Sequence, residues 1–254
     1  MPGADVEEAL LVRDTDADWR ELGASNPYWG VISHPDFQAE NITPERIEQF
    51  YESGPFHIGP MVADLEKLTG VKPSGRALDF GCGVGRLAEA MLAYADEVTG
   101  VDISPGMLEL ARARGSKVRY VDTIPDEQFD WINSFIVFQH IPPARGEQIF
   151  ETLLSKLAPG GMISLQLTIW REAGHVWPEE RGLRRLFQAA RQRRWARRLP
   201  LGQILMFDYN LSRIVRLVNL AGIQDIRLVS TDHGGHHGVI ILGRKTAPAS
   251  KDPS

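Results

Sequence analysis

Two kinds of hydrophobic pattern follow each other along this chain. Short apolar runs, typical of buried strands, alternate with longer stretches in which apolar residues recur at helical spacing. The short runs cover residues 76–80, 97–101, 117–121, 129–134 and 162–168. Strands that alternate with helices in this way are typical of an α/β protein.

Capping residues mark where the helices begin and end. Thr43-Pro44-Glu45 combines a side-chain cap, a proline in the first turn and an acid near the positive end of the helix dipole. A helix therefore begins there, and it ends near Ser53-Gly54. Further helices are expected over residues 58–68, 84–95, 105–114, 147–157 and 211–221.

The last part of the chain departs from this alternation. Residues 223–230 and 238–243 are expected to form an antiparallel pair, with His233, His236 and His237 at the tip of the hairpin. A closed metal site needs ligands from several directions, and no cysteine or paired histidine elsewhere completes one. We therefore expect no bound metal.

The pattern also divides the chain into regions. We expect residues 1–70 to form an N-terminal helical cap, 71–246 the main domain, and 247–254 a disordered tail. Within the main domain, residues 170–207 are rich in tryptophan and arginine and are expected to form a helical insertion that roofs the substrate pocket. The alternatives are a solvated surface helix or a contact between two copies of the chain, so a homodimer stays open. Asn26-Pro27-Tyr28-Trp29 is expected to be a turn before an anchoring tryptophan.

Composition narrows the class of protein. Apolar residues make up 43% of the 254 residues, which is enough for one large core. The formal net charge of −5 argues against nucleic acid as a partner of the whole molecule. The single cysteine, Cys82, excludes an intrachain disulfide, and no apolar run approaches the ~18 residues of a membrane helix. Since the acidic N-terminus lacks a signal-peptide core, we expect a cytoplasmic protein without a membrane partner.

Candidate chemistry begins where the first strand runs into Gly81, Gly83 and Gly85. Glycines at alternate positions let the backbone bend sharply and let a ligand approach the main chain. The following helix directs its free N–H groups and positive dipole end at this loop. The second strand ends in Asp102, whose carboxylate can accept both ribose hydroxyls of an adenosine.

Several motifs in succession carry a resemblance to a known family. They are Leu78-Asp79-Phe80-Gly81-Cys82-Gly83-Val84-Gly85, Gly100-Val101-Asp102-Ile103-Ser104, Phe129-Asp130-Trp131-Ile132, Phe138-Gln139-His140-Ile141 and Leu157-Ala158-Pro159-Gly160-Gly161. In this order and spacing they resemble the class I S-adenosylmethionine-dependent methyltransferases, over about residues 71–168 and loosely in the C-terminal hairpin. The resemblance implies a three-layer Rossmann-like α/β sandwich. Its mostly parallel seven-stranded sheet has an antiparallel last strand, with N-terminal helices and a helical insertion after the fifth strand.

The resemblance also implies S-adenosylmethionine as the cofactor and S-adenosylhomocysteine as its product. Helices before the first strand cover the cofactor in related enzymes, which makes Arg46, Tyr51 and His57 candidates. Whether Asp122 accepts from the adenine amino group or is a turn acid facing solvent stays open. The residues implied to contact the cofactor are Tyr51, Asp79, Gly81, Cys82, Gly83, Arg86, Asp102, Ile103, Met107, Asp122, Thr123, Phe135 and Gln139.

Methyl transfer from a sulfonium is an in-line displacement, so the protein must align the nucleophile, the methyl group and the sulfur. A hydroxyl nucleophile also needs a base, and histidine suits that role near neutral pH. His140, after the fourth strand, is the first candidate, with loop packing as its alternative role, and His236 is held in reserve. Aromatic residues and arginines in 170–207 favour a hydroxyl of a small polar metabolite, such as a sugar or a glycosylated natural product.

Other functions compete with this one. The arginines between residues 184 and 198 favour an N-methyltransferase of RNA or protein, but the negative net charge opposes it. Asn26-Pro27-Tyr28-Trp29 lacks the second proline of the box found in adenine and glutamine N-methyltransferases and precedes the glycine loop. A non-catalytic scaffold would not need the glycines and Asp102. A nicotinamide oxidoreductase would need a third glycine where Arg86 stands.

Overall fold

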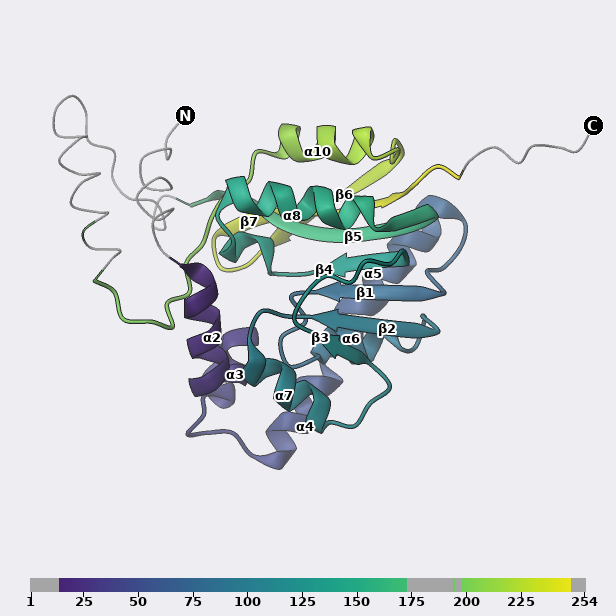
Figure 1. Cartoon of the computed structure of the whole chain (residues 1–254). Helices are drawn as coiled ribbons and strands as arrows, with labels where there is room; N and C mark the ends of the chain where they lie inside the picture. Colours follow the sequence, from purple (N-terminus) through teal and green to yellow (C-terminus); the bar gives the residue numbers. More distant parts are fainter. Residues whose placement is uncertain (1–13, 173–193, 195–197, 248–254) are drawn as a thin grey trace, which may run out of the picture.

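The computed structural model describes residues 14–172, 194 and 198–247 (Figure 1). A seven-stranded sheet in the order β3-β2-β1-β4-β5-β7-β6 forms its centre. Strands β1 to β5 pair in parallel, and β7 runs antiparallel to both β5 and β6. This confirms the predicted sheet. The strands are β1 (Arg76–Phe80), β2 (Glu97–Val101), β3 (Arg119–Val121), β4 (Phe129–Ser134), β5 (Leu157–Arg171), β6 (Ile226–Asp232) and β7 (His236–Arg244).

The helices follow from caps that the sequence carries. The side chains of Thr43, Ser104 and Asn210 each accept a hydrogen bond from the backbone of the following helix. The α-helices are α2 (Thr15–Ser25), α3 (Pro27–Val31), α4 (Pro44–Glu52), α5 (Gly54–Thr69), α6 (Arg86–Met91), α7 (Pro105–Ala113), α8 (Pro143–Ser155) and α10 (Leu211–Leu220). Two short 3-10 helices are η1 (Pro35–Phe37) and η2 (Phe138–His140).

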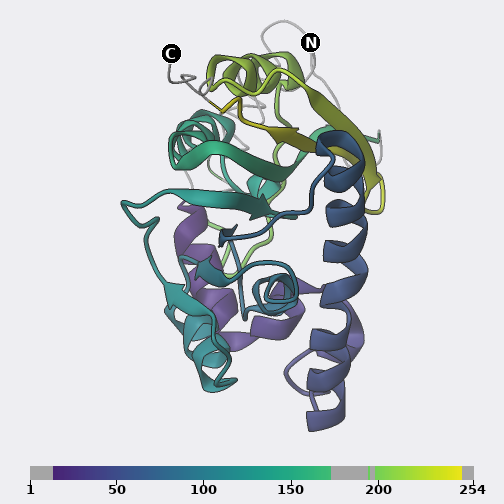
Figure 2. The same ribbon diagram turned by 90° about the vertical axis from the view of Figure 1, so that its right-hand side faces the viewer.

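Each face of the sheet carries its own hydrophobic core. On one face α5 and α6 pack against residues such as Trp131 and Leu242, and Figure 2 shows the long α5 standing beside the sheet. On the other face α8 and α10 pack against residues such as Ile132 and Leu165. Neighbouring residues of β4 therefore point to opposite layers, which is the period of a strand buried on both sides.

The N-terminal region differs from its prediction. Asn26-Pro27-Tyr28-Trp29 is not a simple turn, because Asn26 ends α2 and Pro27 immediately begins α3. The side chain of Asn26 instead accepts from the backbone N–H of Ala39 at 2.8 Å. Proline in the first turn of α3 needs no hydrogen-bond acceptor for its nitrogen, so a new helix can begin there.

Other predicted boundaries move by a few residues. β5 already begins at Leu157, so Pro159-Gly160-Gly161 lies within the strand as the structure assigns it, and not in a turn before it. β7 begins at His236, which places His236 and His237 in the strand and leaves His233 in the hairpin turn. The ladder extends beyond its predicted end because Trp170 and Arg171 of β5 pair with His237 and His236. The ring of His237 also stacks on that of Trp170, with centroids 3.8 Å apart.

Most of the predicted insertion at 170–207 and the tail after residue 247 lie outside the described residues. Within the described part, the chain returns through residues 198–210 to α10. None of the described helices is both long and apolar enough to cross a membrane.

Candidate functional site

A cavity of about 310 Å³ opens at the carboxyl ends of the central parallel strands. Residues at or just after the carboxyl ends of β1, β2, β3 and β4 line it: Asp79 lies in β1, and Asp102, Asp122 and Phe135 follow the other three strands. The sheet order reverses between β1 and β4, and ligands of open α/β sheets bind at such a switch point. The volume reaches the lower end of the range for small-molecule sites.

The glycine loop forms the floor of this cavity. Gly81 has a φ of 73°, and a Cβ there would lie 2.3 Å from a methyl carbon of Val137. Gly83 has a φ of 54°, and its Cβ would lie 2.7 Å from Val31. Both positions therefore require glycine for conformation and for space. The loop leaves bare main chain facing the cavity.

Asp102 fixes the loop from the end of β2. One carboxylate oxygen accepts from the backbone N–H of Gly83 at 2.8 Å, and the other accepts from that of Ser104 at 2.8 Å. Burial raises the pKa of Asp102, while these hydrogen bonds oppose the rise. Each oxygen keeps a further lone pair, so Asp102 can still accept from a ligand's hydroxyls.

Arg86 and Asp79 place opposite charges on the next part of the wall. Arg86 is buried, and one of its terminal nitrogens contacts Ser53 Oγ at 3.2 Å and His57 Nδ1 at 3.1 Å. Its Nε is buried without a hydrogen-bond partner among the described residues. Burial lowers the pKa of Arg86 to about 10 and raises that of Asp79 to about 7. A ligand with a carboxylate and an ammonium group fits this pair.

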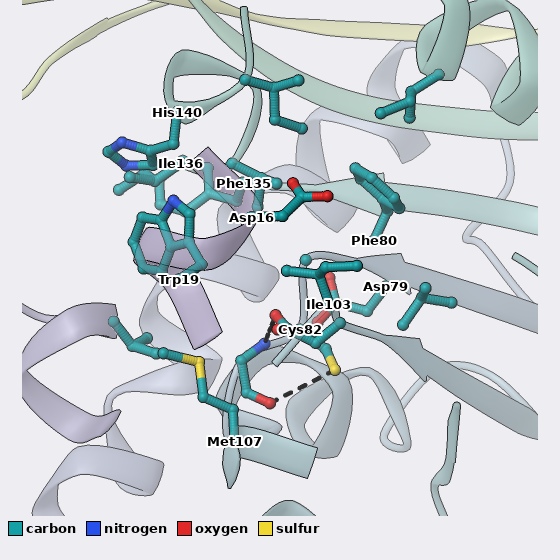
Figure 3. A pocket seen from close by; sticks show the side chains of 18 of the residues that line it. Asp16, Trp19, Asp79, Phe80, Cys82, Ile103, Met107, Phe135, Ile136 and His140 are labelled. Carbon is teal, nitrogen blue, oxygen red and sulfur yellow. Dashed lines mark hydrogen bonds between the residues drawn. The ribbon is translucent and has the colours of Figure 1, made fainter. Parts of the chain in front are cut away.

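His140 lies on the opposite wall, above α2 (Figure 3). Its Nδ1 lies 2.8 Å from the carbonyl oxygen of Leu205, which requires the proton on Nδ1. Its Nε2 then accepts, and the side-chain amide of Gln139 lies 3.3 Å away. Burial lowers the pKa of His140 to about 4, so the ring is neutral at neutral pH. The one lone pair of the ring, on Nε2, lies at the edge of the cavity within hydrogen-bond distance of the Gln139 amide.

Helix α2 supplies a part of the wall that the sequence did not predict. Trp19 packs on His140 with ring centroids 4.8 Å apart. Asp16 accepts two hydrogen bonds from Arg145 of α8, at 2.6 and 2.8 Å, and both residues line the cavity. Asp14, whose side chain caps α2, is the sequence feature that could have predicted this helix. Its buried face mixes polar and apolar residues, so the hydrophobic pattern of this helix is weak.

Ile136 is a second wall residue that sequence reasoning missed. It has a φ of 59°, which is unusual for a β-branched residue. Gln166 Oε1 accepts from its backbone N–H at 3.0 Å and so helps to hold this conformation. A strained residue beside a cavity is a feature of functional sites.

Most of the predicted contact residues come together here. Those that line the cavity are Asp79, Gly81, Cys82, Gly83, Arg86, Asp102, Ile103, Met107, Asp122, Thr123, Phe135 and His140. Tyr51, Gln139 and His236 do not line it. The hydroxyl of Tyr51 donates to the carbonyl of Val84 and so supports the glycine loop from behind. The side-chain oxygen of Gln139 accepts from Thr168, and His236 lies at the start of β7.

The described histidines form no metal-binding cluster, and Cys82 lies in surroundings that disfavour its reactive thiolate form. Cys82 is buried, and burial raises the pKa of its thiol well above the ordinary value. Within the part of the chain that the structure describes, no group of three or more His, Cys, Asp or Glu residues is arranged to hold a metal ion.

Comparisons with known proteins agree with this geometry. The family model described as "Methyltransferase domain" matches residues 77–161. The chain is 34% identical over 134 residues to trans-aconitate 2-methyltransferase of Rhizobium etli, a match that spans 50% of this chain and 52% of that protein. It is 30% identical over 157 residues to a ubiquinone biosynthesis O-methyltransferase of Idiomarina loihiensis, spanning 52% of this chain and 64% of that protein. Both matches thus cover less than two thirds of the relatives.

A solved structure shares the fold over most of the chain. It is the magnesium protoporphyrin IX methyltransferase from Synechocystis PCC 6803 with bound SAH, with a TM-score of 0.59 and 18% identity. The alignment covers 92% of this chain and 100% of that one. At this identity the likeness concerns the fold.

Proposed function

Since residues 77–161 match a methyltransferase-domain family model, we propose that the chain is a class I methyltransferase that binds S-adenosylmethionine in the cavity and transfers its methyl group to a small acceptor. One observation carries the proposal. The bare glycine loop, Asp102 and the pair Asp79 and Arg86 line a single cavity. Main chain, hydroxyl acceptor and paired charges are the groups that a nucleoside joined to an amino acid requires.

In this proposal, different residues bind different parts of the cofactor. Asp102 receives the ribose hydroxyls, and Gly81 and Gly83 allow close approach of the backbone. Arg86 Nε, buried without a partner among the described residues, is placed for the carboxylate, and Asp79 for the ammonium group. When bound, the cofactor supplies an electrophilic methyl group on a sulfonium. The protein contributes alignment and the exclusion of water.

We further propose that the acceptor is a hydroxyl of a small polar metabolite, with His140 as the base. Its Nδ1–H is held by Leu205, so Nε2 can take the proton of a hydroxyl that displaces the Gln139 amide. An O-methyltransferase among the relatives supports oxygen as the acceptor atom. We also propose a cytoplasmic location, which the single cysteine, Cys82, supports because a reducing compartment disfavours disulfides.

Calorimetry with S-adenosylmethionine and S-adenosylhomocysteine tests the first proposal. We expect saturable heat from both, and no heat and no thermal shift would overturn it. A screen of paired hydroxyl and amine acceptors then tests the second. Turnover of amines alone would overturn oxygen as the acceptor and leave the cofactor assignment standing.

A further inference from the structure

A line of buried polar side chains crosses the sheet beneath α5 and α6. Asp79, Asn133 and Ser164 occupy paired positions on the adjacent strands β1, β4 and β5. Trp131 precedes Asn133 by one strand period and lies on the same face. All four side chains are at most 2% exposed.

Hydrogen bonds join these residues in one direction. Trp131 Nε1 can only donate, and it donates to Ser164 Oγ at 3.0 Å. Ser164 then donates to Asn133 Oδ1 at 2.7 Å. This turns the amide nitrogen of Asn133 toward Asp79 Oδ1, to which it donates at 2.8 Å. Because the indole of Trp131 can only donate, the direction of the other two hydrogen bonds is fixed, and Asp79 Oδ1 accepts the last of them.

Packing alone does not explain four polar groups at this place. Residues of similar shape without polar atoms would fill a core equally well, whereas any broken link leaves a buried group unpaired. The chain of hydrogen bonds ends on a carboxyl group that lines the cavity. The direction of these hydrogen bonds favours a form of Asp79 in which Oδ1 carries no proton and accepts from Asn133.

We propose that Trp131, Ser164 and Asn133 are positioning residues that orient the Asp79 carboxylate toward a cationic group bound in the cavity. This rests on the proposed function, in which that group is the ammonium of the cofactor. Arg86 of α6 and Asp102, the residue after β2, also interact electrostatically with Asp79, as do Cys82 and Tyr120. The donor from Asn133 and the charge of Arg86 oppose the effect of burial on the Asp79 pKa.

The test is an infrared titration of the Asp79 carboxyl in the full chain without cofactor, with Asp79→Asn to assign the band. We expect Asn133→Leu to raise the pH at which Asp79 ionises the most, Ser164→Ala less, and Trp131→Phe least. The order follows the distance along the hydrogen bonds. At neutral pH, Asn133→Leu is also expected to weaken S-adenosylhomocysteine binding about tenfold.

Thr168→Val is the matched control. Thr168 is a buried hydroxyl two strand periods along β5 from Ser164, and it donates to Gln139 Oε1 at 2.9 Å instead. It should lower thermal stability but leave the Asp79 titration in place. Equal shifts in Thr168→Val and Ser164→Ala, or shifts that follow the loss of stability, would overturn the inference. Absence of cofactor binding by the unaltered protein would overturn the proposed function, while the titration would still decide this inference.

Discussion

The two sides of the cavity are built by different means. The floor is main chain: the loop from Gly81 to Gly85 and its hydrogen bonds to β2 and Asp102. The opposite wall is side chains from separate elements, since Asp16 and Arg145 are 129 residues apart in sequence and His140 and Leu205 are 65 apart.

The difference determines how each side tolerates change. On the floor, a single added methyl group must distort the backbone, because glycine is required by both conformation and space. On the opposite wall, a lost side chain removes one contact among several. Substitutions on the floor should therefore act mainly on cofactor affinity, and those on the wall on turnover and on the seating of α2.

The largest effect on the floor is expected for Gly81→Ala. The positive φ and the approach to Val137 together cost about 3 kcal/mol, which corresponds to about a hundredfold loss of S-adenosylhomocysteine affinity if it falls on the bound state. Calorimetry measures it. Gly115→Ala is the control, because Gly115 has a φ of 69° with no atom within 4 Å of a Cβ. It should lower stability without changing affinity, and equal affinities for both variants would contradict the distinction.

His140→Ala tests the wall. We expect turnover to fall about a hundredfold with little change in cofactor affinity, since the base is lost and the floor is intact. His34→Ala, an exposed histidine, is the control. Near-normal turnover in His140→Ala would show that His140 does not take the proton and that its role is to pack the loop.

The pH dependence sharpens this test. His140 must be neutral to act as a base, and its pKa is about 4, below the ordinary 6.5. The acid limb of kcat/KM should therefore lie near pH 4. The same shift contributes stability that is complete above pH 6.5 and is lost as the pH falls toward 4. Denaturant unfolding across this range should show a flatter profile for His140→Ala.

Among substitutions on the floor, we expect Asp102→Ala to have the second-largest effect on cofactor affinity. Loss of charged hydrogen bonds to the ribose is worth about 1–3 kcal/mol, or about five- to 150-fold in affinity. Asp122→Ala is the control, because Asp122 lines the same cavity but is exposed, so water competes with it. Unchanged calorimetric affinity in Asp102→Ala would reject the role of Asp102.

The same division explains what could be predicted from the sequence. The strands along the chain, the glycine loop and Asp102 follow from local patterns, the predicted seven-stranded sheet is confirmed, and a methyltransferase-domain family model matches residues 77–161. The position of α2 was not predicted, because its buried Thr15 and Asp18 give no apolar stripe. Ile136 was missed because its backbone is held by Gln166, a residue 30 positions away. Contacts between distant side chains leave no local pattern to read.

The smallest effect should come from breaking the ion pair between Asp16 and Arg145. Its two hydrogen bonds have good geometry, but the Arg145 side chain is 46% exposed, so water and salt screen the pair. We expect Arg145→Ala and Asp16→Asn each to weaken cofactor binding only about two- to fourfold, through a looser seating of α2. Their coupling in a double-mutant cycle should be about 0.5–1 kcal/mol and should fall at high salt. Zero coupling would assign the seating of α2 to the packing of Trp19 on His140. A coupling of several kcal/mol between Asp16 and Arg145 would mean that this wall tolerates change as poorly as the floor does. That result would refute the difference drawn between the two sides of the cavity.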